Sequence, residues 1–195
     1  MAARRRLAAT GSGGKSPLPS PRIARPTPAL AQAQGTWIAA LEPWRGLGYR
    51  GEALGRYLGR KARTGNVWVA RTAGKGVPLA IAVVDDGVLL GGFIALLAVR
   101  PEASGQGLGR ALVEHVAAQT FATRRWLYVS SDGNNAAALR FYRKLGFSRV
   151  GRLPDLVRQG RTEILLRKSA PIAASKPGTK IPTARSRVGY HQGGS

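Results

Sequence analysis

The sequence contains no cysteine and only two histidines, His115 and His191, which lie far apart. Without cysteine, the chain has no disulfide bond, no thiolate ligand for a metal and no cysteine nucleophile. Two distant histidines also argue against a histidine-based metal cluster and against a Ser-His-Asp triad. We therefore expect no bound metal and no catalysis by a cysteine nucleophile or a Ser-His-Asp triad.

Acidic residues are also scarce, because nine Asp and Glu residues stand against 31 Lys and Arg residues, for a net charge of +22. Residues 1–35 hold six of the basic residues and residues 170–195 hold four, with no acid in either segment. The central part keeps 21 basic and nine acidic residues, a net charge of +12. Such a charge favours nucleic acid, anionic membranes and phosphate-bearing ligands. A solvated basic surface without a dedicated partner explains it equally well.

A long hydrophobic run is missing as well. No segment reaches the ~20 apolar residues that span a bilayer, so we expect no membrane span. Arg4, Arg5 and Arg6 begin the chain like a secretory signal, but the apolar segment that should follow is too short and too rich in glycine. We expect a cytoplasmic protein; an organelle transit peptide is a second interpretation of the basic start.

The two ends differ in composition from the middle. Prolines at positions 17, 19, 21, 26 and 28 accompany Arg, Ala, Ser and Gly in residues 1–35, and residues 170–195 are similar. Such segments bury too little apolar surface to offset the entropy lost on ordering. We predict two disordered basic tails, 1–35 and 170–195, around one domain at 36–169.

The central pattern mixes strands and helices. Strands are predicted at 36–41, 67–72, 77–84, 88–99, 126–130, 147–151 and 162–167, with turns at 73–76 and 85–87 and helices at 107–120 and 135–145. Residues 43–63 have helical spacing interrupted by glycines, of which Gly51, Gly55 and Gly59 share one face. Those glycines allow close packing, or they reflect composition alone. Gly91 and Gly92 predict a bulge or bend in a buried strand.

A glycine-dense turn precedes the helix at 107–120. Gly105, Gly107 and Gly109 let the backbone approach a ligand, and the first N–H groups of the helix lack partners inside it. Together with the helix dipole, these groups form a phosphate site. A Walker-type loop is rejected because Gly-Lys-Ser/Thr is absent. A dinucleotide fold is a weak rival, since the spacing is G-x-G-x-G although Asp132 follows at a suitable distance.

Two motifs resemble the signatures of the GCN5-related N-acetyltransferase (GNAT) family. The first covers residues 104–109 and the second runs from Asn135 through Tyr142 to Phe147. The similarity extends over residues 36–168. It implies an α/β fold with a mixed, largely antiparallel central sheet and flanking helices, the acyl-CoA N-acyltransferase fold. It also implies direct transfer of an acetyl group from acetyl-CoA to an amine.

The resemblance assigns roles to particular residues. Backbone groups of Ala98 and Val99 would hold the pantetheine arm, Asn135 would reach the cofactor, and Tyr142 would protonate the departing thiolate. The N–H groups of the glycine turn would hold the pyrophosphate, namely those of Gly105, Gln106, Gly107, Leu108, Gly109 and Arg110. An alternative interpretation is that Tyr142 is a structural residue of the hydrophobic core. Ser104 replaces the family's usual Arg or Gln, so one phosphate or loop contact is lost or is made by Arg100 or Arg110.

The sequence does not identify the general base. The strand at 88–99 carries no acid, which leaves Glu42, Glu52 and Asp155 as candidates by position, with a water relay as an equal alternative. The resemblance places acceptor contacts in residues 44–57 and 154–160, where Trp44 and Tyr49 line a pocket or close the core.

The acceptor is a small-molecule or peptide amine of open identity, and a homodimer is an option because similar proteins often dimerise. An alternative function is a catalytically weak GNAT-like domain that binds nucleic acid or the ribosome through its basic tails.

Overall fold

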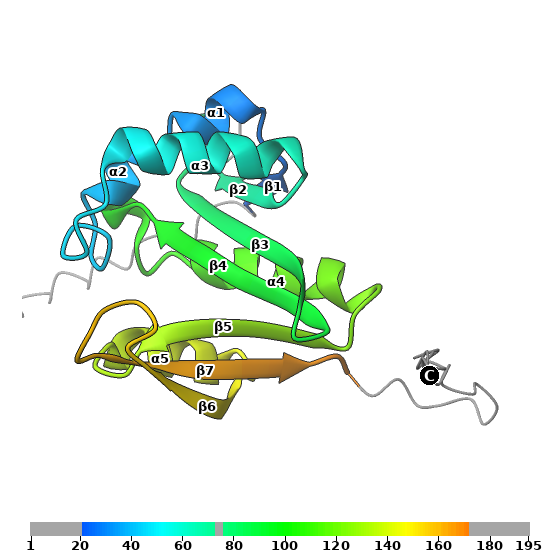
Figure 1. Ribbon diagram of the computed structural model, residues 1–195. Coiled ribbons are helices and arrows are strands. Elements are labelled where there is room, and N and C mark those ends of the chain that lie inside the picture. The colour runs from blue at the N-terminus through cyan, green and yellow to red at the C-terminus, as the bar shows by residue number, and fades with distance from the viewer. Residues whose placement is uncertain (1–20, 73–75, 172–195) are drawn as a thin grey trace, which may run out of the picture.

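A seven-stranded sheet forms the centre of the computed structural model, which describes residues 21–72 and 76–171 (Figure 1). The elements are β1 (Arg22–Ala24), α1 (Pro28–Gln32), α2 (Gly35–Ala39), α3 (Gly51–Arg63), β2 (Val67–Arg71), β3 (Ala80–Val88), β4 (Gly91–Val99), the 3-10 turn η1 (Pro101–Ala103), α4 (Leu108–Phe121), β5 (Trp126–Asp132), α5 (Ala136–Lys144), β6 (Ser148–Pro154) and β7 (Thr162–Ser169).

The strands lie in the order β1-β2-β3-β4-β5-β7-β6. All neighbours are antiparallel except β4 and β5, which are parallel. Parallel neighbours need a long crossover, and η1 with α4 supplies it. The expected mixed, largely antiparallel sheet with flanking helices is confirmed.

Helices cover both faces of the sheet, and each layer encloses its own core (Figure 1). One core joins α4 and α5 to the sheet through Leu112, Val116, Leu127 and Ile164. The other lies between α1–α3 and β2–β4, around Ile38 and other fully buried side chains. Among the described helices, none is long and apolar enough to cross a bilayer.

The predicted start of the folded domain at residue 36 is wrong. β1 pairs with β2, and α1 packs on α3 with Ala31 fully buried. The prolines had favoured a disordered segment. However, Pro28 lies in the first turn of α1, where its fixed φ and missing N–H are tolerated. The Thr27 hydroxyl caps the same helix by accepting the Leu30 N–H at 3.2 Å. The rest of the predicted tails, 1–20 and 172–195, lies outside the described residues.

The strand predicted at 36–41 is also wrong, because this segment belongs to α2 and the turn after it. A short apolar run does not distinguish a strand from a buried helix, and here Ile38 is fully buried against α3. The glycine-rich segment after it contains α3, which is continuous from Gly51 to Arg63. A Cβ added at Gly55 would lie 2.6 Å from the Gln32 carbonyl oxygen, so this glycine permits the predicted close packing.

The hairpin between β3 and β4 turns later than predicted. Residues 85–87 lie inside β3, and Gly87 sits at a register shift with a φ of 79°. The chain reverses at Leu89 and Leu90, whose φ values of 49° and 63° are unusual for residues with side chains. Gly91 approaches the Trp126 backbone closely at the start of β4. Gly91 and Gly92 pair on either side of the register shift at Gly87, so the predicted bulge is present, with its extra residue on β3. The turn predicted at 73–76 falls largely on residues 73–75, outside the described residues.

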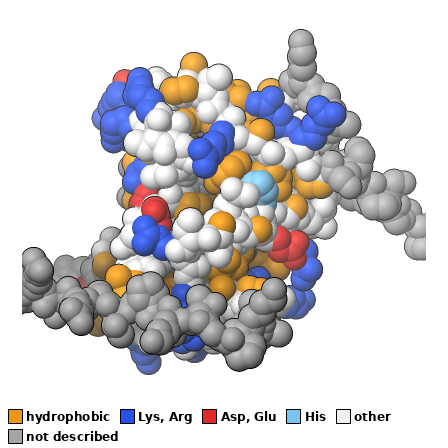
Figure 2. All heavy atoms as spheres, turned by 90° about the vertical axis from the view of Figure 1, so that its right-hand side faces the viewer, with side chains coloured by type: hydrophobic (Ala, Val, Ile, Leu, Met, Phe, Trp, Pro, Cys, Tyr) orange, Lys and Arg blue, Asp and Glu red, His pale blue; other side chains and the backbone are white. Residues whose placement is uncertain are grey.

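The charge of the surface is partly compensated. Seven of the nine acidic residues form ion pairs among the described residues. Figure 2 shows Lys and Arg side chains in separate groups, with apolar and neutral surface between them, on the face it presents. That face carries no continuous basic stripe outside the grey atoms.

Candidate functional site

The parallel strands β4 and β5 stay together over only three residue pairs. These pairs are Gly92–Leu127, Phe93–Tyr128 and Ile94–Val129. Beyond them, β4 continues to Val99 beside β3 while β5 continues to Asp132 beside β7. The sheet therefore splits at its centre, and the facing backbone edges of β4 and β5 are available to a ligand.

A bulge in β4 lies at the start of this split. Val84 pairs with Ile94 and Val83 pairs with Leu96, which leaves Ala95 without a partner on β3. The extra residue changes the face of the following side chains: Ile94 joins the α4 core, while Leu96 joins the α3 core. Ala95 itself is exposed. The bulge thus turns β4 where its backbone leaves β5.

A pocket of about 420 Å³ lies between the end of β4, the glycine turn and α5. Six residues expected at the cofactor site line it, namely Val99, Gly105, Gly107, Leu108, Gly109 and Arg110. The sequence interpretation missed Leu97, Ala103, Phe141, Lys144 and Leu145, and it named Ser104 only as a departure from the family. Phe141 on α5 and Leu145 at its C-cap lie four residues apart, a spacing that could have shown a shared helical face.

The glycine turn presents backbone N–H groups to this pocket. Gly107, with a φ of 83°, is the N-cap of α4 and makes no side-chain capping bond. The first helical hydrogen bond runs from the Ala111 N–H to the Gly107 carbonyl. The N–H groups of Leu108, Gly109 and Arg110 therefore have no partner within α4. The positive end of the α4 dipole lies at the same place and favours an anion.

Gly109 fits closely between β4 and α5. A Cβ at this position would lie 3.3 Å from Val99 and 3.5 Å from Phe141. Gly105 and Gly107 differ, because their added Cβ atoms would meet nothing within 4 Å. The turn is thus tight on the side of the protein and open on the side of the pocket.

Three expected cofactor residues do not line this pocket. The Ala98 side chain is buried in the α3 core, and the Gln106 amide donates to the Glu102 carbonyl at 3.0 Å. The Asn135 side chain caps α5 by accepting the Ala138 N–H at 3.0 Å. Contacts of these residues with a cofactor stay predictions.

Of the two residues suggested to replace the Arg or Gln missing at Ser104, only Arg110 lies at the pocket. Arg100 is engaged elsewhere, because its guanidinium donates to the Pro78 carbonyl at 2.9 Å and lies 4.8 Å from the Trp37 ring centroid. Arg110 stays more than half exposed and pairs with Glu114 at 3.2 Å.

Tyr142 on α5 is buried in the core shared with α4, with 6% of its surface exposed. Its ring packs edge-on against Phe141 and Phe147, at centroid distances of 5.1 and 5.5 Å. Burial raises the pKa of the phenol well above its ordinary value, so the hydroxyl keeps its proton. Phe141 lines the pocket and Tyr142 lies beside it.

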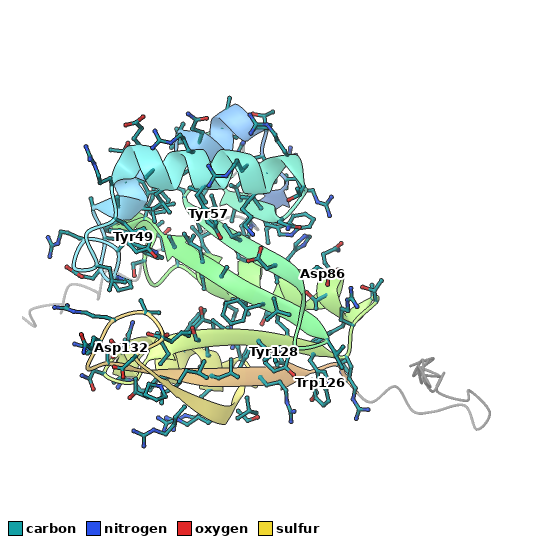
Figure 3. All side chains as sticks on the ribbon, in the orientation of Figure 1. Tyr49, Tyr57, Asp86, Trp126, Tyr128 and Asp132 are labelled. Atoms are coloured by element: carbon teal, nitrogen blue, oxygen red, sulfur yellow. The ribbon has the colours of Figure 1, made fainter. Side chains whose placement is uncertain are left out.

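A second pocket, of about 330 Å³, opens on the other side of the β4 bulge. It is lined by Trp44, Tyr49, Ala53, Leu54, Tyr57, Ala95 and Leu96. Figure 3 shows Tyr49 and Tyr57 between α3 and the sheet. Burial, reinforced by the nearby Asp85, raises the pKa of Tyr57 to about 12. Trp44 and Tyr49 therefore line a pocket as expected, and Trp44 also packs on the α3 core.

A smaller pocket of about 140 Å³ joins the two segments in which acceptor contacts were expected. It is lined by Glu42, Pro43, Leu47, Asp132, Val157, Arg158, Arg161 and Glu163. Asp132 stands at the end of β5 (Figure 3). The fold thus brings residues 42–47 and 157–161 to the split end of the sheet.

The three base candidates from the sequence are engaged at the surface. Glu42 pairs with Arg45 at 2.9 Å and Glu52 pairs with Arg56. The Asp155 carboxylate accepts the Gly160 N–H at 2.6 Å. The sequence interpretation missed Glu163, which is only 9% exposed. Burial, together with the charge of Asp132, raises the pKa of Glu163, while the Ser130 hydroxyl and Arg161 oppose the shift.

Comparisons with known proteins agree with this geometry. Residues 63–149 match the family model of the acetyltransferase (GNAT) domain. No curated protein matches the chain in sequence.

Solved structures share the fold at low identity. Ard1 from Thermoplasma volcanium is 20% identical with a TM-score of 0.64, over 77% of this chain and 97% of that chain. A GNAT-family acetyltransferase from Bacillus cereus ATCC 10987 is 12% identical with a TM-score of 0.63, over 77% and 98%. A chain of the NatC complex bound to Gag peptide and CoA is 20% identical with a TM-score of 0.55, over 76% and 98%.

Proposed function

Since the chain carries a GNAT acetyltransferase domain, we propose that it transfers an acetyl group from acetyl-CoA directly to the amino group of an acceptor. The observation that carries this proposal is the position of the 420 Å³ pocket between an uncapped helix N-terminus and the end of β4, which has separated from β5. The first feature suits a pyrophosphate, and the second suits a chain of amides that pairs with a strand edge.

The residues present fit acetyl-CoA. The N–H groups of Leu108, Gly109 and Arg110 would hold the pyrophosphate, with Lys144 contributing positive charge across the pocket. The backbone of β4 near Ala98 and Val99 would hold the pantetheine arm, and Asn135 would contact it from the start of α5. Acetyl-CoA supplies the activated acyl group, so the chain itself needs to bind, orient and move protons.

Tyr142 is the proposed donor of the proton that the departing sulfur takes up. Its phenol keeps this proton at neutral pH because burial raises the pKa. Its ring packs against Phe141, which lines the cofactor pocket, and this contact supports the proposed role.

The acceptor is proposed to enter from the opposite side of the bulge. The pocket there is lined mainly by apolar and aromatic side chains, including Trp44, Tyr49 and Tyr57, and it reaches Ala95 at the bulge. Such a lining favours an amine attached to an apolar or aromatic body. The NatC structure was determined with both a peptide and CoA, which supports a peptide amine as one acceptor class.

The first test is calorimetric titration of the full chain with acetyl-CoA and, as a control, with NAD. We expect saturable binding of acetyl-CoA alone. The second test measures thiol release with 2-phenylethylamine, phenylalaninamide and spermidine as amine probes. Faster release with the two aromatic probes supports the proposal. Absence of acetyl-CoA binding contradicts it and favours a basic nucleic-acid-binding module, which an RNA titration would then examine.

A further inference from the structure

Glu163 differs from every other acidic residue of the chain in its surroundings. Seven of the nine acidic side chains form ion pairs among the described residues, and Asp155 binds the Gly160 N–H. Glu163 has no ion-pair partner within 4.0 Å in the described part of the chain, although it is only 9% exposed. A carboxylate taken out of water without a partner costs stability. A role for Glu163 in the functional site would explain why a carboxylate occupies this buried position.

The strand register places Glu163 at the split in the sheet. Glu163 on β7 pairs directly with Asp132 on β5, so both side chains point to the same face. Ser130 lies two residues before Asp132 on that face, and its hydroxyl lowers the pKa of Glu163 as a hydrogen-bond donor. Ser130 is also the first residue of β5 beyond its last pair with β4, Val129–Ile94. Glu163 therefore reaches the point where β4 and β5 separate.

Glu163 also faces the side from which an acceptor would arrive. It lines the 140 Å³ pocket with Leu47 and Val157, which come from the two segments in which acceptor contacts were expected. Asn135, the proposed cofactor contact on α5, follows Asp132 after only two residues. The segment 42–49 lines both this pocket, through Leu47, and the aromatic pocket proposed for the body of the acceptor, through Trp44 and Tyr49, so the two pockets share one loop.

The charged groups around Glu163 leave it free to accept a proton. Arg161 forms an ion pair with Asp132, with nitrogen–oxygen distances of 2.6 and 2.9 Å. The positive charge of Arg161 lowers the pKa of Glu163, and the negative charge of Asp132 opposes this effect. Glu42 and Arg158 come from the two loops that close the pocket, and Leu153 lies opposite on β6. Burial is the largest influence on this group and raises its pKa, which makes the carboxylate a stronger base.

We infer that Glu163 is the general base that removes a proton from the acceptor ammonium group at this pocket. The inference rests on the proposed acetyl transfer. The Glu163 carboxylate takes one proton from R–NH₃⁺ and becomes a carboxylic acid. The neutral nitrogen then forms a C–N bond with the thioester carbonyl carbon, and the C–S bond breaks with its electron pair on sulfur. Tyr142 gives its proton to the thiolate and is reprotonated by the second proton from nitrogen, and Glu163 releases the first to solvent.

The test compares two nucleophiles that differ in their need for a base. 2-Phenylethylamine is protonated near neutral pH, whereas hydroxylamine is neutral there. For Glu163→Gln we expect kcat/KM with 2-phenylethylamine to fall about 100-fold or more, while activity with hydroxylamine is nearly unchanged. The acidic limb of the kcat/KM profile with 2-phenylethylamine should also disappear. The matched control is Asp86→Asn, an exposed carboxylate on β3 outside the three pockets, which should behave like the wild type.

Each outcome has a defined meaning. Equal kcat/KM of wild type and Glu163→Gln with 2-phenylethylamine would overturn the inference and leave acetyl transfer intact. Equal losses with both nucleophiles, with unchanged acetyl-CoA affinity and no decrease in melting temperature, would also overturn it in favour of a positioning role. If the wild type binds acetyl-CoA but acetylates neither nucleophile, the proposed function fails and the base role fails with it.

Discussion

Two groups of glycines in this protein serve opposite purposes. At the contact of α1 and α2 with α3, a Cβ on Gly55 or Gly51 would lie 2.6 or 2.9 Å from the backbone of the facing segment. In the turn before α4, a Cβ on Gly105 or Gly107 would meet nothing within 4 Å. The first group must lack side chains, because protein backbone already fills the space that a Cβ would occupy. The second group needs a left-handed backbone, with φ values of 77° and 83°, and leaves its space to a ligand.

The largest effect is expected from Gly55→Ala, which tests the packed group. The added methyl would press on the Gln32 carbonyl at 2.6 Å, and backbone yields less easily than a side chain. Forcing α1 away from α3 should lower the free energy of unfolding by about 1–3 kcal/mol, measured by urea denaturation. Acetyl-CoA affinity of the remaining folded protein should not change. Unchanged stability would show that these glycines reflect composition and not packing.

Tyr142→Phe tests whether this residue belongs to the core or to the site. Phenylalanine keeps the ring contacts with Phe141 and Phe147 but removes the acidic proton. We expect turnover with 2-phenylethylamine to fall about 100-fold, with acetyl-CoA affinity retained in calorimetry. Wild-type turnover in this variant would assign Tyr142 to the core alone.

Gly107→Ala tests the open group. An L-residue at a φ of 83° strains the turn by about 1–2 kcal/mol, and relief of that strain would move the N–H groups that face the pocket. Acetyl-CoA affinity should fall about tenfold. The matched control is Gly87→Ala, which has a φ of 79° and equally open space in β3. A similar loss of affinity in both variants would contradict a binding role for the turn.

The smallest effect is expected on the pH dependence of stability in Glu163→Gln. Burial raises the folded-state pKa of Glu163 above its ordinary value of 4.5, so the folded protein holds this proton more tightly than the unfolded chain. The wild type should therefore lose stability as pH rises through the folded pKa. The glutamine variant should melt a few degrees higher near neutral pH, with the difference vanishing at pH values below 4.5. A lower melting temperature for the variant at neutral pH would argue against an uncompensated charge.

The site was predictable from the sequence where neighbouring residues build it. The turn from Gly105 to Arg110 is a local pattern, so this side of the pocket was expected from its motif, whereas the side formed by Phe141, Lys144 and Leu145 was missed. The bulge at Ala95 and the position of Glu163 depend on which residues pair between strands far apart in the sequence. A single sequence does not reveal that register, and for this reason Glu163 was not among the base candidates chosen from the sequence.

The errors in the fold have a similar origin. The segment before residue 36 has the composition of a disordered tail, yet it gains β1 through pairing with β2 and α1 through packing on α3. The β1 residues pair with residues 45 to 49 positions later in the chain, and α1 contacts α3 residues about 23 to 31 positions later. Composition describes what a segment does alone, so it misses structure that a neighbour stabilises.

The three residue pairs between β4 and β5 also have a mechanical consequence. They are the sheet's central connection between β1–β4 and β5–β7, so a pulling force applied across the strands would concentrate on very few hydrogen bonds. A molecule that pairs with β4 in the split would add to this connection and make the free protein and the complex differ in stiffness. Amide hydrogens along the facing edges of β4 and β5 would then exchange with solvent more slowly in the complex, even at residues that the ligand does not touch.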